Sequence, residues 1–93
     1  MIEYEWDEMK RQLNLAKHGL DFEDAWRVFE AEMKVTMERP LQGEMRYLDF
    51  AVVEGRLLAL VYTLRNQAIR IISFRKANYP KEVQLYEHGI QNS

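Results

Sequence analysis

The chain of 93 residues contains no cysteine, only two histidines and only two prolines. Without cysteine it can form neither a disulfide scaffold nor a thiolate zinc site, and it cannot use a cysteine nucleophile. Its longest apolar run, Leu57 to Tyr62, is far shorter than the roughly 18 residues that span a bilayer, so no membrane segment is expected. Residues 1–8 are acidic where a secretory signal would be basic, and we therefore expect a cytoplasmic protein.

The composition is that of a folded globular protein. Apolar residues make up 47% of the chain and charged residues 30%, which excludes disordered and fibrous classes. A chain this short buries only about 60 to 65% of its unfolded surface and cannot divide that area between two cores. We therefore expect a single domain over residues 1–93.

Two helices are predicted near the amino terminus. The first has Asp7 as its N-cap and Gly19 at its C-terminal end, and it is amphipathic. Its apolar positions at helical spacing are Met9, Leu13 and Ala16. The second begins at the cap Asp21 and carries an aromatic stripe that is expected to be core. This stripe consists of Phe22, Ala25, Trp26 and Phe29.

After Glu32 the apolar pattern changes to the period of a strand. A short strand at 35–37, a candidate edge strand, precedes a loop at 39–43, and β-rich runs follow at 46–53, 57–64 and 68–75. Compact turns at 54–55 and 66–67 predict an antiparallel meander. A brief extended segment at 2–5 is a further edge candidate.

The run at 57–64 is apolar at nearly every position, so both faces of the sheet should be covered there. The predicted C-terminal helix can cover the second face, because Pro80 suits its first turn and Val83 and Tyr86 share one side; Gly89 would close its end. The fold class is therefore α+β, with two N-terminal helices, an antiparallel sheet of three to four strands and a C-terminal helix.

Charge is distributed unevenly along the chain. Residues 1–54 contain 13 acidic and 7 basic side chains, whereas residues 55–93 contain 6 basic and 2 acidic ones. Four of those six bases are arginines, which suit bidentate phosphate contacts and indicate an anionic ligand. The alternative is that they are solvated strand residues paired with the acidic first half.

The sequence contains no motif typical of a metal site or of a catalytic nucleophile. His18 and His88 lie 70 residues apart with no metal-binding spacing, and Ser73 lies outside any nucleophile motif, so we predict neither a metal nor a cofactor. Internal transfer within RNA needs none of these groups, because the ribose 2'-hydroxyl is itself the nucleophile and arginines can stabilise charge on phosphorus.

Six motifs in order over about residues 4–87 resemble the BrnT family. They are Tyr4-x-Trp6-Asp7-x-x-Lys10, Asn14-x-x-Lys17-His18-Gly19-Leu20-x-Phe22-x-x-Ala25, Glu44-x-Arg46, Tyr62-Thr63-x-Arg65, Ile69-Arg70-Ile71-Ile72-Ser73-x-Arg75-x-Ala77 and Glu82-x-x-x-Tyr86. The sequence departs from the family's pattern at Phe74, where a small residue is usual, and at 79–81, which is often more basic.

The resemblance implies the toxin of a bacterial type II toxin-antitoxin pair with a RelE-like fold. Such a toxin is a metal-independent RNA endonuclease that blocks translation by cutting RNA, either free or ribosome-associated, and a BrnA-like ribbon-helix-helix antitoxin neutralises it. Operator DNA would be contacted only through the antitoxin. An acidic and apolar antitoxin tail could fold over the arginines.

Site roles are assigned on these motifs. The catalytic candidates are His18, Arg46, Thr63, Arg75 and Glu82. The RNA-binding candidates are Lys17, Arg65, Arg70, Lys76 and Tyr86. Structural alternatives stay open: His18 can simply cap its helix, and Glu82 can pair with a strand arginine. By strand periodicity Arg70 and Arg75 fall on opposite faces unless a bulge or strand-end twist intervenes.

Two other functions compete with the nuclease. One is a non-catalytic nucleic-acid or antitoxin-binding module that acts as a transcriptional co-repressor. The other is a helix-turn-helix repressor built on the two N-terminal helices, which is disfavoured because those helices carry far more acids than bases and would repel DNA.

Overall fold

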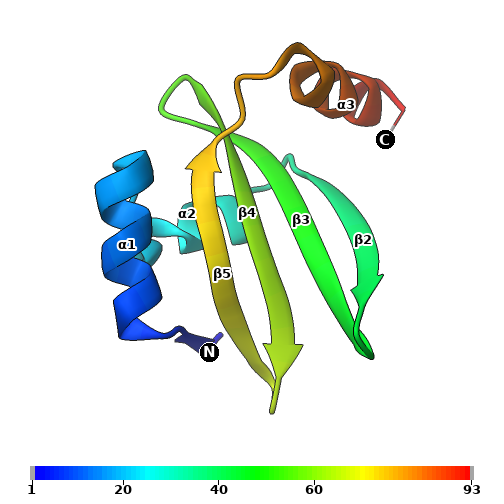
Figure 1. Ribbon diagram of the computed structural model, residues 1–93. Coiled ribbons are helices and arrows are strands. Elements are labelled where there is room, and N and C mark those ends of the chain that lie inside the picture. Colours follow the sequence, from blue (N-terminus) through cyan, green and yellow to red (C-terminus); the bar gives the residue numbers. More distant parts are fainter. Residues whose placement is uncertain (1, 93) are drawn as a thin grey trace.

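A computed structural model describes residues 2–92, and the ends of the predicted domain at 1 and 93 lie outside the described residues (Figure 1). The elements are β1 (Tyr4–Glu5), α1 (Glu8–His18), the 3-10 turn η1 (Phe22–Asp24), α2 (Trp26–Phe29), β2 (Val35–Leu41), β3 (Glu44–Val53), β4 (Arg56–Arg65), β5 (Ala68–Lys76) and α3 (Pro80–Gln91). The α+β class is confirmed. Within residues 2–92, no helix combines the length and apolarity that crossing a membrane requires.

The strands form one five-stranded sheet in the order β1-β5-β4-β3-β2, so the prediction of three to four strands is wrong. The meander from β2 to β5 is antiparallel as predicted, and each of its three turns consists of two residues with positive φ, as type I′ hairpins require. At the edge, β1 pairs with β5 in parallel, so the sheet is mixed. The predicted loop at 39–43 is also wrong: β2 continues through Pro40, which is tolerated because β2 is an edge strand.

The predicted second N-terminal helix is absent as a continuous helix. Its place is taken by η1 and by α2, which has only four residues. The buried residues here are Phe22, Ala25 and Val28, and a spacing of three fits a 3-10 turn better than an α-helix. Trp26, expected in the core, is 45% exposed. A four-residue α2 is also too short to serve as a recognition helix, which removes the helix-turn-helix alternative.

Each face of the sheet has its own core. On the face covered by α1, η1 and α2, which we call the helical face, the large buried strand residues include Leu60, Ile71 and Phe74. On the other face, Phe50, Ala59 and Ala77 form a smaller cluster with Tyr86 of α3. In Figure 1, α2 is seen behind the strands and α3 crosses the end of the sheet where β5 finishes. Coverage of both faces is therefore confirmed for the middle of β4, but Leu64 is exposed.

Helix α3 does not end at Gly89, as predicted, but continues to Gln91. Gly89 instead lies where the helix approaches β2 most closely. A Cβ atom built there would sit 2.6 Å from Cγ2 of Val35, nearer than packed atoms can approach. Glycine at this position thus lets α3 pack onto the sheet edge.

Helix α1 has the predicted caps, but its polar side faces the sheet, where an amphipathic helix would normally place its apolar side. The Asp7 side chain accepts from the amides of Met9 and Lys10, and Gly19 adopts a left-handed conformation with φ of 71°. The apolar residues Met9 and Leu13 are nevertheless 71% and 65% exposed. The most buried residue of α1 is the polar Asn14.

Asn14 connects α1 to the free edge of β5. Its Nδ2 donates to the carbonyls of Leu20 (3.0 Å) and Phe74 (2.7 Å), and its Oδ1 accepts from the Phe74 amide at 3.1 Å. The side-chain amide therefore completes the hydrogen bonding of Phe74 as a neighbouring strand would. This contact explains why the polar side of α1 faces inward.

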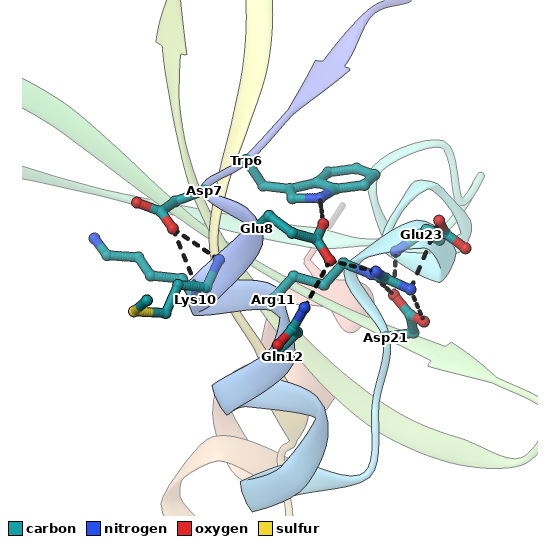
Figure 2. Close-up of polar contacts among 9 residues, drawn as sticks. Trp6, Asp7, Glu8, Lys10, Arg11, Gln12, Asp21 and Glu23 are labelled. Atoms are coloured by element: carbon teal, nitrogen blue, oxygen red, sulfur yellow. Dashed lines mark hydrogen bonds and ion pairs between the residues drawn. The ribbon is translucent and has the colours of Figure 1, made fainter.

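A second set of polar contacts fixes α1 against η1, as Figure 2 shows. The guanidinium of Arg11 donates to both carboxylate oxygens of Asp21, at 2.8 and 2.9 Å, and to Glu8 at 2.7 Å. These hydrogen bonds from Arg11, together with one from the Glu23 amide, lower the pKa of Asp21. The same carboxylate caps η1, so one residue orients both elements.

We predict that Asn14→Ala destabilises the protein by about 2 to 4 kcal/mol, because the substitution leaves buried backbone groups of Phe74 and Leu20 unpaired. Urea unfolding measures the change, and amide exchange at Phe74 should accelerate. The control Lys10→Ala lies on the same helix and should be nearly neutral. A loss below about 0.5 kcal/mol for Asn14→Ala would show that water replaces the side chain.

Acid should weaken the contact between Arg11 and Asp21. Because the folded pKa of Asp21 is depressed, its contribution to stability is complete above its unfolded pKa of about 3.9 and is lost as the pH falls through the folded pKa. Asp21→Asn should be less stable than the parent at pH 7, and the two should converge as the pH drops below about 4. Unfolding midpoints at several pH values test this, with exposed Glu32→Gln as the control; a gap that is independent of pH would contradict it.

Candidate functional site

A bulge in β5 brings together two arginines that strand periodicity would separate. Val61 pairs with Ser73, but its neighbour Tyr62 pairs with Ile71, so the register shifts by one residue. Residue Ile72 is the extra one, and the side-chain alternation reverses across it. Arg70 and Arg75 consequently lie on the same face, through the bulge that the sequence analysis named as the exception to opposite faces.

One cross-strand row runs over all five strands on this face. Arg39 pairs with Arg46, Arg46 with Thr63, Thr63 with Arg70, and Arg70 with Glu5 of β1. Directly paired residues share a face, and neighbouring strands lie about 4.8 Å apart. Two guanidinium groups can therefore reach over Thr63 from either side. We call this side the arginine face; its arginines are Arg39, Arg46, Arg65, Arg70 and Arg75.

Thr63 forms the floor of the row. Its side chain is almost fully buried, and its hydroxyl donates to the Met45 carbonyl at 2.8 Å. With this proton already used, the hydroxyl links β4 to β3.

Two glutamates lie beside arginines of the arginine face. Glu44 accepts from Arg65 at 3.1 Å and lies 4.0 Å from Nε of Arg46, and Glu5 lies 3.5 Å from Arg70. These carboxylates restrict long side chains that would otherwise lose entropy on binding. Glu5 and Glu44 come from the acidic first half of the sequence, so the arginine face is less basic than residues 55–93 alone suggest.

Arg75 forms a bidentate ion pair with Glu82. Its two terminal nitrogens donate to the two oxygens of Glu82 in α3, at 3.0 and 2.6 Å. These hydrogen bonds are the main reason that the pKa of Arg75 is raised, so its positive charge is secure at any working pH. Glu82 has both oxygens occupied and is only 15% exposed, which favours a positioning role.

Among the arginines of the arginine face, Arg46 has a buried donor that lacks a hydrogen-bond partner within residues 2–92. This donor is the Nε of its guanidinium. An unpaired buried donor costs free energy, and an acceptor atom from a ligand would recover it. Beside Arg46 lies a groove of about 300 Å³ with a largely apolar lining. The lining includes Met37, Arg39, Leu41, Leu48 and Val61.

The structure places the predicted site residues in two groups. Those on or against the arginine face are Arg46, Thr63, Arg65, Arg70, Arg75 and Glu82. Lys17 and His18 are instead in the last turn of α1, which packs at the edge of β5. Lys76 pairs with Leu58 and therefore points to the helical face. Tyr86 of α3 does lie against the arginine face, but it packs on the cluster around Phe50 and not beside the row of arginines.

Sequence reasoning missed Arg39 and Glu5 as neighbours of the site. Arg39 alternates correctly with Val35 and Met37, and a two-residue turn at 42–43 would have set it opposite Arg46. Glu5 had no such signal, because its position follows from a parallel pairing between distant segments.

The part of the chain from 2 to 92 contains no cluster of three histidine, aspartate or glutamate side chains arranged to hold a metal ion. The functional groups that the arginine face offers are guanidinium groups, which suit bidentate, permanently charged binding of a phosphodiester.

Comparison with known proteins assigns the family. No curated protein matches the chain closely enough to be informative. Residues 6–81 match the family model described as the ribonuclease toxin, BrnT, of type II toxin-antitoxin systems. The matched range contains all five arginines of the arginine face, whereas Glu5 and Glu82 lie just outside it. Because the match covers most of the chain, the protein belongs to the BrnT family of ribonuclease toxins from type II toxin-antitoxin systems.

Proposed function

We propose that this toxin is a metal-independent endoribonuclease that cuts messenger RNA on the arginine face and thereby inhibits translation. The observation that carries the proposal is the row in which Arg46 and Arg70 flank the buried Thr63. Arg75, held by Glu82, lies on the same face further along β5, opposite Ala59. Two arginines that bind one phosphate from either side provide the charge stabilisation that phosphoryl transfer requires.

In the proposed reaction the ribose 2'-oxygen attacks the neighbouring phosphorus and the bond to the 5'-oxygen breaks. The 2'-hydroxyl loses a proton to a base, the leaving oxygen gains one, and the products carry a 2',3'-cyclic phosphate and a 5'-hydroxyl. Arg46 and Arg70 bind the phosphoryl oxygens as negative charge develops, and Arg75 binds the RNA strand further along the same face. Arginine does not exchange protons in proteins, so these residues act as electrostatic groups.

The groove beside Arg46 extends the proposal to the rest of the substrate. Its apolar floor and its two arginines, Arg39 and Arg46, suit an unstacked base with its phosphate. Arg65 and Arg70 would bind the backbone on the other side of Thr63. Lys17, Lys76 and Tyr86 lie away from this row, and His18 stays a predicted proton carrier that the arginine face does not include.

The partners belong to the same proposal. A BrnA-like ribbon-helix-helix antitoxin would neutralise the toxin and would itself carry the contact to operator DNA. Action on messenger RNA, free or at the ribosome, sets the site of action in the cytoplasm.

We predict that Arg46→Ala and Arg70→Ala each reduce the rate of RNA cleavage about 100-fold, because each removes one group that stabilises charge in the transition state. The purified chain is assayed on RNA in EDTA with end-group analysis for cyclic phosphate. The matched control is Arg56→Ala, whose residue lies at the start of β4 opposite Val53, outside the arginine face. Retarded but intact RNA with the parent chain would instead support the non-catalytic co-repressor module.

Glu82 is predicted to act by positioning Arg75 rather than by transferring a proton. Glu82→Gln should lower kcat about 10-fold, because one charged hydrogen bond to Arg75 is replaced by a weaker one, while the pH dependence of kcat keeps its shape. A general base would behave differently: its loss would remove the acidic limb of the profile. That limb therefore decides between the two roles.

A further inference from the structure

The amphipathic helix α1 packs on the sheet through its polar side and exposes its apolar side to solvent. Its inward side consists of Arg11, Asn14 and His18, whereas Met9 and Leu13 are 71% and 65% exposed on the outward side. A surface helix normally buries its apolar positions. Met9, Leu13 and Ala16 follow one another at spacings of four and three, so they form one continuous ridge, which we call the α1 stripe.

The charges beside the α1 stripe are asymmetric. Lys10 and Lys17 flank it on one side, both exposed, and neither forms an ion pair within residues 2–92. In Figure 2, Lys10 extends away from the contacts around Arg11. On the opposite flank the carboxylate of Glu8 is already occupied by Arg11 and Gln12. The stripe thus has one free basic edge.

We propose that the α1 stripe is the surface on which the antitoxin docks, through a segment that combines apolar side chains with carboxylates. The inference rests on membership of a toxin-antitoxin family, which supplies a partner chain, and not on the nuclease chemistry proposed above. Apolar residues of the segment cover Met9 and Leu13, and its carboxylates meet Lys10 and Lys17. This arrangement leaves no exposed apolar ridge and no unpaired cation on α1.

A second copy of this chain fits the stripe less well. Helix α1 has 11 residues and is therefore about 16 Å long, too short to supply most of the roughly 800 Å² per partner of a stable interface. Two copies paired as antiparallel helices about a twofold axis would also place their lysine edges against each other. An antitoxin segment meets neither difficulty, because it can continue over other surfaces and carries its own charge.

The arginine face fits an acidic segment less well than α1 does. Arg65, Arg70 and Arg75 already have glutamate partners, which an incoming carboxylate would have to displace. On α1 no displacement is needed. The antitoxin tail expected over the arginines stays a prediction, and the experiment below separates the two surfaces.

The test measures binding of the co-encoded antitoxin to the full toxin chain by titration calorimetry. Met9→Ser/Leu13→Ser should weaken binding roughly 30- to 100-fold, because central apolar anchors carry much of an interface's affinity. Lys10→Glu should weaken it about 10-fold at low salt and less at high salt. The matched control, Met33→Ser/Leu64→Thr, changes two exposed apolar residues elsewhere and should bind as the parent does.

RNA cleavage without antitoxin and the unfolding midpoint are measured on the same variants, and both should be unchanged in Met9→Ser/Leu13→Ser. Antitoxin binding within twofold of the parent would overturn the proposal, as would an Arg46→Ala variant that loses binding while the stripe variant keeps it. A toxin dimer that the stripe substitutions dissociate would assign the surface to a second copy instead. If the parent cleaves no RNA but the stripe variant loses antitoxin, the docking surface stands and the nuclease proposal fails.

Discussion

One extra residue in β5 determines which side chains can act together in this toxin. Without Ile72 as a bulge, side-chain alternation would direct Arg70 and Arg75 to opposite faces of the sheet. With it, both stand on the face that also carries Arg46, and the helical face still receives Ile71 and Phe74 for its core. The bulge thus satisfies two requirements at once: the helical face stays apolar, and the opposite face carries all three arginines beside the small apolar cluster under α3.

The orientation of α1 is determined by polar contacts with the edge of β5. Hydrophobic burial alone would turn Met9 and Leu13 inward. The free edge of β5 has backbone groups at Phe74 that must be paired, and Asn14 pairs them. Leaving such groups unpaired costs about 1 to 3 kcal/mol each, comparable to the burial of an apolar side chain, so the edge can determine which side of the helix packs. The apolar side then remains outside and is available to a partner.

The sequence predicted local features better than relations between distant segments. The hairpins at 54–55 and 66–67 and the caps Asp7 and Gly19 were readable because each depends on a few neighbouring residues. The short α2 and the exposed Trp26 were not, because Phe22, Ala25 and Val28 follow a spacing that also resembles a helix. For the site, alternation left the relation between the two β5 arginines dependent on a bulge, and nothing local marks Ile72 as the bulged residue. Glu5 beside Arg70 was equally hidden, because it joins the sheet in parallel from the other end of the chain.

Strand pairing also changes what the charge pattern means. Along the sequence, acids concentrate before residue 55 and bases after it, which suggests one strongly basic surface. In the fold, two glutamates from the acidic first half of the sequence lie beside arginines of the basic second half: Glu5 beside Arg70 and Glu44 beside Arg65. A phosphodiester that binds there meets arginines held in fixed positions by carboxylates rather than a bare positive field. Selectivity for the reacting phosphate therefore depends on where the guanidinium groups point, and long-range attraction contributes less than the bare count of arginines implies.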